Sequence, residues 1–328
     1  MKQRKPFFKT LIKILKNSFN GFMDDKVIKL SGSLAYSTVF SMGPLLVVII
    51  SACGLFLGRE AIEGQVYNQL ASFVGADTAK QLQEIIKNAS LSGKSKTAVI
   101  VGGVTLLVGA TAIFSEIQDS INTIWNIKPK PKKGWLMFLK NRLLSFSMII
   151  GLGFLLLVSL GVNTIVDAFN ARLQNLFPGV SVAIFYVINI VITLIVVSLI
   201  FAVIFKVLPD ADIKWKDVKT GAIVTAILFM LGKAAISLYI STSNVGSTYG
   251  ASGSLVILLL WVYYSSIILY FGAEYTKFYA VEYGSPIHPN EYSVTMQVVE
   301  EEKGKTSVQQ NEKEVLAGNK ATVDTRKS

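Results

Sequence analysis

The sequence has little of the side-chain chemistry on which catalytic and metal sites depend. It contains one cysteine, Cys53, and one histidine, His288. A disulfide within the chain needs two cysteines, and neither residue has a second of its kind with which to hold a metal ion. The sequence also carries no phosphate-binding loop and no pairing of a nucleophile with a base. We therefore predict no catalytic residue, no metal site and no cofactor, and we expect the protein not to be an enzyme.

Charged residues are also scarce. They make up 16% of the 328 residues, whereas hydrophobic residues make up 52%, and the mean hydropathy is +0.51. Such a chain is too apolar for an ordinary soluble domain, and a lipid solvent explains it. The net charge of +11 does not indicate nucleic acid, because the lysines and arginines concentrate in the N-terminal arm, two short loops and the tail. We expect membrane lipids, and no nucleic acid, among the partners.

Long runs without charge predict the membrane-spanning helices. A helix needs about 20 apolar residues to cross about 30 Å of hydrocarbon. The last run, 220–273, carries one charge, Lys233, and the polar, glycine-containing stretch 241–254 divides it into two helices. The prediction is an all-α polytopic membrane protein whose six transmembrane helices lie within a domain at 30–281, at about 30–58, 97–119, 143–166, 181–205, 219–240 and 254–277.

The loops differ in their content of lysine and arginine. The arm before the first helix, the loop after the second and the loop after the fourth are rich in both, whereas the loop after the third has only Arg172 and the loop after the fifth has none. Cytoplasmic loops of membrane proteins carry the excess of positive charge. We therefore predict a multi-pass protein of the bacterial inner membrane with both termini in the cytoplasm.

The two ends of the chain have distinct compositions. Within the basic arm 1–29, apolar residues recur at helical spacing opposite lysines, which predicts an amphipathic helix lying in the membrane interface. Residues 282–328 are polar and have too few large apolar side chains to bury a core, so we predict a disordered cytoplasmic tail. The apolar positions of the arm are Phe8, Leu11, Ile12, Leu15 and Phe19.

Three stretches together carry a resemblance to a known family: SGSLAYSTVFSMGPLLVVII, GATAIFSEIQDSINTIWNI, and a third that runs from VLPDADIKW through GSTYGASGSLVILLLWVYYSSIILYFGAEYTKF. Over residues 20–280 the chain resembles the YihY/BrkB family, whose members were once labelled ribonuclease BN. The resemblance implies a six-helix membrane fold, with proposed roles in moving lipids or other envelope components and in resistance to host killing. The residues do not support the nuclease label, because phosphodiester hydrolysis usually needs metal-bound carboxylate or histidine clusters.

Lys233 is the strongest single-residue candidate for a binding role. It lies about 13 residues into its predicted helix, roughly 20 Å from the start, where an ammonium group is costly unless it is paired or hydrated. One interpretation is that Lys233 holds an anionic head group or a counter-ion. The other is that its flexible stem carries the charge out to the interface.

Acidic residues near the predicted cytoplasmic ends form a second candidate set. Glu116, Asp119 and Asn122 recur every three residues, which places them on one side of a helix where they would gate or bind a cation. The alternative is an interfacial cap whose acids pair with neighbouring lysines. Glu274 lies near the same side of the membrane, and its candidate partners are Lys206, Lys214 and Lys277.

Small and helix-breaking residues form a third set. Gly43 and Pro44 predict a kink in the first transmembrane helix, and a bent helix with Ser37 and Ser41 would line a cavity. The alternative is that these small residues only allow close helix packing. Tyr249 lies in the stretch 241–254, which either folds back towards the membrane or forms a plain hairpin.

These candidates predict a protein that transports or binds a lipid-like or anionic envelope component. Its expected partners are membrane lipids and an anionic lipid or envelope precursor. The alternative is a non-transporting membrane scaffold for envelope assembly, and a membrane ribonuclease is the weakest reading, because the sequence offers no cluster of metal ligands.

Overall fold

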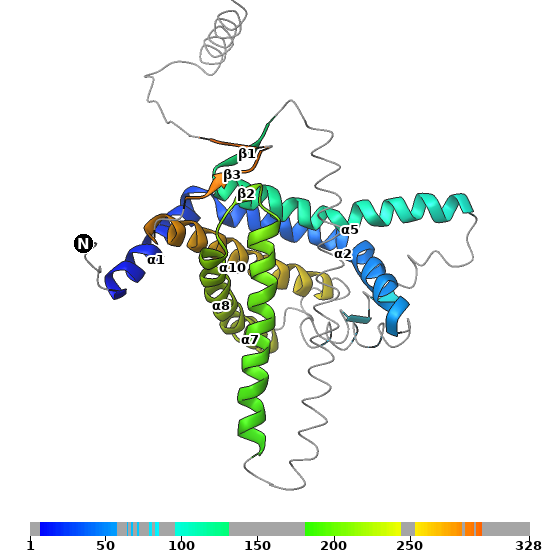
Figure 1. The fold of residues 1–328 in the computed structure, drawn as a ribbon. Helices are drawn as coiled ribbons and strands as arrows, with labels where there is room; N and C mark the ends of the chain where they lie inside the picture. The colour runs from blue at the N-terminus through cyan, green and yellow to red at the C-terminus, as the bar shows by residue number, and fades with distance from the viewer. Residues whose placement is uncertain are drawn as a thin grey trace, which may run out of the picture. The chain divides into compact units, whose positions relative to one another are not determined.

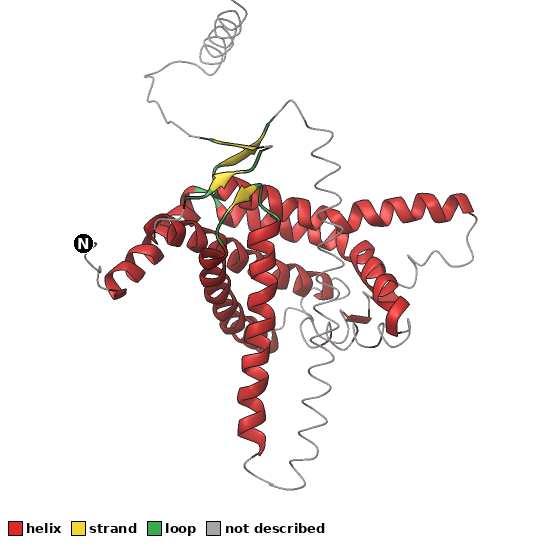
Figure 2. Ribbon diagram, viewed as in Figure 1, coloured by secondary structure: helices red, strands yellow, loops and turns green. Residues whose placement is uncertain are grey.

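The computed structural model describes residues 7–57, 96–130, 181–243, 253–283, 286–291 and 293–296, with isolated positions between 64 and 84. Most of these residues are helical, as Figure 2 shows, and the predicted helical fold is confirmed. All of the elements below belong to the unit Met1–Thr295. The helices are α1 (Phe7–Asp24), α2 (Val27–Leu57), α5 (Lys96–Ile124), α7 (Ser181–Val207), α8 (Trp215–Thr242) and α10 (Gly253–Tyr283).

Four of the described helices are long and apolar enough to cross a membrane. They agree with four of the six predicted segments, because a charge-free run of this length predicts a membrane-spanning helix. α5 covers the predicted segment 97–119 and is helical, although it is not among the four. The segment 143–166 lies outside the described residues, so the count of six stays a prediction. The four spans are Val27–Val47, Val187–Val207, Trp215–Tyr239 and Leu255–Tyr283.

α10 is the central helix of the bundle. It packs against α1, α2, α5 and α8 (Figure 1). Glycines make the contact with α8 close: a Cβ atom at Gly221 would collide with Thr276, and one at Gly272 would collide with Thr225. Small residues of this kind allow helix backbones to approach in lipid, where association depends on packing.

α2 and α5 form the other close helix pair. A Cβ atom at Gly109 would lie 2.9 Å from Cβ and Cγ of Pro44, so the proline ring fills the space above this glycine. Pro44 lies inside α2, and α2 changes direction along its length in Figure 1. A proline within a helix removes a backbone hydrogen bond and bends it. The same residue thus serves both helix packing and the bend.

Four short strands lie together at one end of the bundle, beside the ends of α5 and α7 (Figure 1). β1 pairs with β4 in antiparallel register, with Ile127 opposite Thr295, and β2 pairs with β3, with Ala211 opposite Pro289. We call this end the basic end, because Lys128 and Lys130, in and just after β1, and Lys214, between β2 and α8, lie there. The strands are β1 (Ile127–Pro129), β2 (Ala211–Asp212), β3 (His288–Pro289) and β4 (Ser293–Thr295).

The strands correct the predicted start of the disordered tail at residue 282. α10 continues to Tyr283, and β3 and β4 follow it. Composition did not reveal this order, because the segment is held by backbone pairing to β1 and β2 and buries little apolar surface of its own. Residues 297–328 lie outside the described part of the chain, and disorder there stays a prediction.

α1 has three distinct sides. Ile14, Ser18 and Gly21 are buried, and α10 is the helix against which α1 packs most extensively. The lysines at 9, 13 and 16 are exposed. A third side presents large apolar side chains to the outside, namely Phe8, Ile12, Leu15, Phe19 and Met23. The N-terminal arm thus contains a helix with exposed lysines and exposed apolar side chains, and its place in the membrane interface stays a prediction.

Candidate functional site

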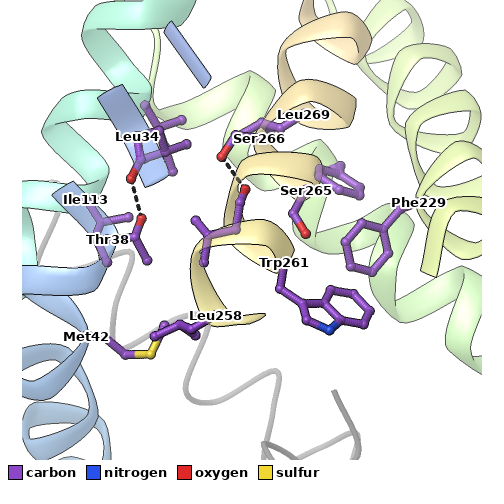
Figure 3. Close-up of a pocket in the computed structure, with 13 residues that line it drawn as sticks. Leu34, Thr38, Met42, Ile113, Phe229, Leu258, Trp261, Ser265, Ser266 and Leu269 are labelled. Carbon is purple, nitrogen blue, oxygen red and sulfur yellow. Dashed lines mark hydrogen bonds between the residues drawn. The ribbon is translucent and has the colours of Figure 1, made fainter. Parts of the chain in front are cut away.

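An apolar cavity lies within the helix bundle (Figure 3). Its volume is about 400 Å³, and its walls come from α2, α5, α7, α8 and α10. Most of the wall is hydrocarbon or aromatic, including Leu34, Ile113, Phe201, Phe229 and Leu258. The cavity is therefore shaped by five elements that are far apart in the sequence.

Two of the three hydroxyl groups in the wall are turned towards their own helices, and the third belongs to Ser265. Thr38 donates a hydrogen bond of 2.7 Å to the carbonyl of Leu34, and Ser266 donates one of 2.6 Å to the carbonyl of Val262 (Figure 3). Because these donors are satisfied by backbone carbonyls one turn away, they offer little to a polar ligand. The cavity presents an apolar interior despite the serine and threonine side chains in its wall.

The predicted cavity-lining residues of α2 differ from those observed. Leu34, Thr38 and Met42 form the α2 wall at spacings of four residues. Ser37 is half-buried and Ser41 is buried, and neither lines this cavity. α2 thus borders the cavity through Leu34, Thr38 and Met42 rather than through the predicted Ser37 and Ser41.

Lys233 lies near this cavity but not in its wall. Phe229 lines the cavity, and Lys233 follows it by four residues on α8, which places it on the same side of the helix and about 6 Å further along the axis. Lys233 is half-buried, whereas Leu231 is exposed. Gly232 lies against Tyr264 of α10, so closely that a Cβ atom would collide with its ring and hydroxyl. Lys233 therefore lies next to this contact between α8 and α10. It is near the end of the cavity that is farther from the basic end.

Asp210 is the centre of a buried hydrogen-bond network at the basic end, and it was not among the predicted site residues. Its carboxylate accepts hydrogen bonds from Asn122 at 2.9 Å, Gln118 at 3.2 Å and Asn290 at 3.2 Å. Its backbone N–H donates to Oδ1 of Asn122 at 2.9 Å, and its carbonyl accepts from the backbone of Asn290. Asp210 is 4% exposed. The network joins α5, the α7–β2 connection and the segment after α10.

The predicted acidic set is divided by this network. Asn122 is buried and turned towards Asp210, whereas Asp119 is exposed and Glu116 is half-buried. Thr123 donates a hydrogen bond to the backbone carbonyl of Asp119. Asn122 therefore has a structural partner in Asp210, and a cation-binding role for Glu116 and Asp119 stays a prediction.

Glu274 and Lys277 form a second charged cluster near the end of α10. Nζ of Lys277 lies 3.2 Å from Oδ2 of Asp25 and 3.6 Å from Oε2 of Glu274, and it donates a hydrogen bond to the carbonyl of Ile124. Glu274 is completely buried. Lys277 was one of three predicted partners for Glu274, and it is the one that the structure brings near. The cluster fixes α10 to the α1–α2 turn and to the end of α5.

Tyr249, which was also predicted to be a binding residue, lies outside the described residues. Within the described part of the chain, no group of three or more histidine, cysteine, aspartate and glutamate side chains is arranged to hold a metal ion. The chemistry that the described residues offer is thus apolar burial, amide hydrogen bonding and a small cluster of charged side chains.

Long apolar helices that pack through glycines around a central helix define a helical integral membrane protein. The chain belongs to the family described as virulence factor BrkB, whose model matches residues 18–292. The resemblance seen in the sequence is therefore confirmed.

The relatives carry names that state location and no activity. The chain is 27% identical to a UPF0761 membrane protein of Haemophilus influenzae, over 77% of this chain and 90% of the relative. It is 29% identical to one of Vibrio parahaemolyticus, over 82% and 81%, and 28% identical to one of Photobacterium profundum, over 88% and 89%. No solved structure matches the chain.

Proposed function

We propose that this protein binds a lipid-like amphiphile of the cell envelope in its apolar cavity and moves it within the bacterial inner membrane. The observation that carries the proposal is the cavity of about 400 Å³ among the bundle helices. This volume lies within the roughly 300–1,000 Å³ that is typical of small-molecule sites. A wall that is mostly hydrocarbon, in which two of the three hydroxyl groups donate to their own backbone, suits an acyl chain, because water would gain few hydrogen bonds there.

Lys233 supports an anionic group at one end of this amphiphile. Its position one turn beyond Phe229 puts an ammonium group close to the end of the cavity. Ionisable residues within membrane helices are costly and commonly mark a substrate or ion pathway. An anionic group bound near Lys233, with its acyl chain in the cavity, would use both features.

The two sides of α1 support the proposed location. The exposed apolar side chains Phe8, Ile12 and Phe19 would enter the lipid, while Lys9 and Lys13 would face anionic head groups. This arrangement fits a helix in the cytoplasmic interface of the inner membrane, with both termini in the cytoplasm. The partners in this proposal are membrane lipids, and it includes no enzymatic step and no nucleic acid.

A photo-crosslinking experiment tests the cavity. The full chain is reconstituted into vesicles that contain phosphatidylglycerol with a diazirine in one acyl chain, and the labelled peptides are identified after irradiation. We expect labelling at Met42 and Leu258, which line the cavity. Ser265→Trp should remove most of this labelling by filling the space, whereas Leu231→Trp, at a position 66% exposed, should leave it unchanged.

The alternative function is a non-transporting scaffold, and one observation favours it. The strands at the basic end hold residues 288–289 and 293–295 in place, which would present partners with a defined platform. The same crosslinking experiment separates the two functions. Equal labelling of the wild type and Ser265→Trp, or labelling only on lipid-exposed positions, would contradict the cavity as a lipid site and favour the scaffold.

A further inference from the structure

A polar cleft of about 450 Å³ lies at the basic end, and it shares no lining residue with the apolar cavity. Asn17, Asn20 and Asp24 of α1 line one wall, with Gly21 between them. Their spacing places them on one side of the helix. Asn126, which follows α5, and Phe278 of α10 complete much of the remaining wall. The cleft is therefore rich in amide and carboxylate oxygen atoms.

The charge of the cleft is negative although the surrounding end of the bundle is basic. Asp24 and Asp25 both line it, against a single cation, Lys277. Lys277 is already bound to Asp25 and to the carbonyl of Ile124, which leaves Asp24 with no ion pair among the described residues. A cleft with surplus carboxylate attracts a positively charged group more strongly than an anionic one.

Glu274 lies behind the wall of the cleft and is 0% exposed. The nearest cation is Nζ of Lys277, at 3.6 Å. Gly21, which lines the cleft, lies against Glu274 and Phe278 of α10: a Cβ atom at this position would lie 2.7 Å from Oε2 of Glu274 and 2.8 Å from a ring carbon of Phe278. The absence of a side chain at Gly21 therefore lets α1 and α10 approach closely at this wall of the cleft.

We propose that this cleft binds a primary alkylammonium group. Such a group has three N–H donors, which match the carboxylate of Asp24 and the side-chain carbonyl groups of Asn17 and Asn20. A quaternary ammonium group has no N–H donor and is usually bound by a cage of several aromatic rings, whereas Phe278 is the aromatic residue that lines this cleft. The site therefore selects the primary amine by its hydrogen bonds.

Two sources can supply this chemistry. One is the head group of a zwitterionic lipid such as phosphatidylethanolamine, presented beside the exposed apolar side of α1. The other is a soluble diamine such as putrescine. The proposal does not depend on the apolar cavity, because the two sites have different walls and Ser265→Trp changes only the cavity.

The test uses the full chain in nanodiscs. Native mass spectrometry measures retained lipid from mixtures of phosphatidylethanolamine, phosphatidylcholine and phosphatidylglycerol, and calorimetry measures putrescine binding in phosphatidylglycerol nanodiscs. We expect preferential retention of phosphatidylethanolamine over phosphatidylcholine, or measurable putrescine binding, and the arm that responds identifies the source. Asp24→Asn should weaken the response about tenfold, the size expected for one charge-assisted hydrogen bond.

Asp212→Asn is the matched control, since it makes the same charge change at an exposed position of β2. It should bind like the wild type. Asp24 is itself exposed, so its substitution should leave folding intact, and unchanged thermal unfolding confirms this. Equal retention of the two zwitterionic lipids together with no putrescine binding would overturn the proposal, as would a response that Asp24→Asn and Asp212→Asn reduce equally.

Discussion

Asp210 shows how a buried carboxylate is held by side-chain amides, with no ion pair to it among the described residues. Three side-chain amides, from Gln118, Asn122 and Asn290, donate to its two oxygen atoms. Buried charge is tolerated when its hydrogen-bonding capacity is met. Because the donors come from two separate segments, Asp210 stabilises the basic end by cross-linking them.

We predict that Asp210→Ala destabilises the protein by about 2–4 kcal/mol, since it leaves buried amide groups of Asn122 and Gln118 without their acceptor. The measurement is the unfolding free energy of purified protein in detergent. Asp212→Ala, two residues along and exposed, should change it by less than about 0.5 kcal/mol. Similar stability of the two variants would show that the network does not hold the basic end together.

The sequence could not reveal this residue because its partners are distant. Asn122 and Asn290 lie 88 and 80 positions away from Asp210, and no local periodicity connects them. The same applies to the predicted set of Glu116, Asp119 and Asn122. The sequence shows their spacing of three residues, but it does not show that Asn122 is hydrogen-bonded to the distant Asp210. By contrast, Lys277 could be named as one of three candidate partners of Glu274, because all of them were predicted to lie near the same side of the membrane.

The contact between helices α8 and α10 depends on glycines, which have no side chain. Gly221 and Gly272 each receive a threonine from the opposite helix, Thr276 and Thr225. Both hydroxyl groups donate to the carbonyl one turn back, at 2.7 Å, so the contact is made by atoms that need no further partner. Close packing of this kind replaces the hydrophobic effect between helices in lipid.

We predict that Gly221→Ala destabilises the protein by about 1–3 kcal/mol, because the added methyl group overlaps Thr276 and forces the helices apart. Gly32→Ala is the matched control: no atom outside its own helical turn lies within 4 Å of a Cβ atom there. It should be neutral or stabilising by up to about 1 kcal/mol, because alanine favours the helix. Thermal unfolding in detergent compares the two, and adding Thr276→Ala to Gly221→Ala should recover part of the loss.

The elements themselves were largely predictable. Segments 181–205, 219–240 and 254–277 lie within α7, α8 and α10, with one or two additional turns in some cases, because a long apolar run in lipid must satisfy its backbone as a helix. The strands were not predictable, since β3 and β4 are only two and three residues long. Their order comes from remote backbone partners and leaves no periodic signal.

The orientation of the whole molecule in the membrane determines which leaflet each of the two proposed sites faces. The polar cleft lies at the basic end, and Lys233 lies towards the other end of α8. If the basic end is cytoplasmic, the cleft faces the inner leaflet and Lys233 lies nearer to the outer one. The proposed amphiphile would then encounter a different polar site at each side of the membrane.

Cysteine labelling at the two ends of α8 tests this orientation. Asp212 lies just before the helix, Thr242 is its last residue, and both are exposed. A helix of 28 residues is about 42 Å long, so the two positions lie on opposite sides of a bilayer.

In a Cys53→Ser background, a cysteine at Thr242 should react with a membrane-impermeant maleimide in cells whose outer membrane alone has been permeabilised. A cysteine at Asp212 should react only after the inner membrane is opened, because the positive charge of the basic end retains it in the cytoplasm. The reverse pattern would place the cleft on the outer side and Lys233 near the inner leaflet.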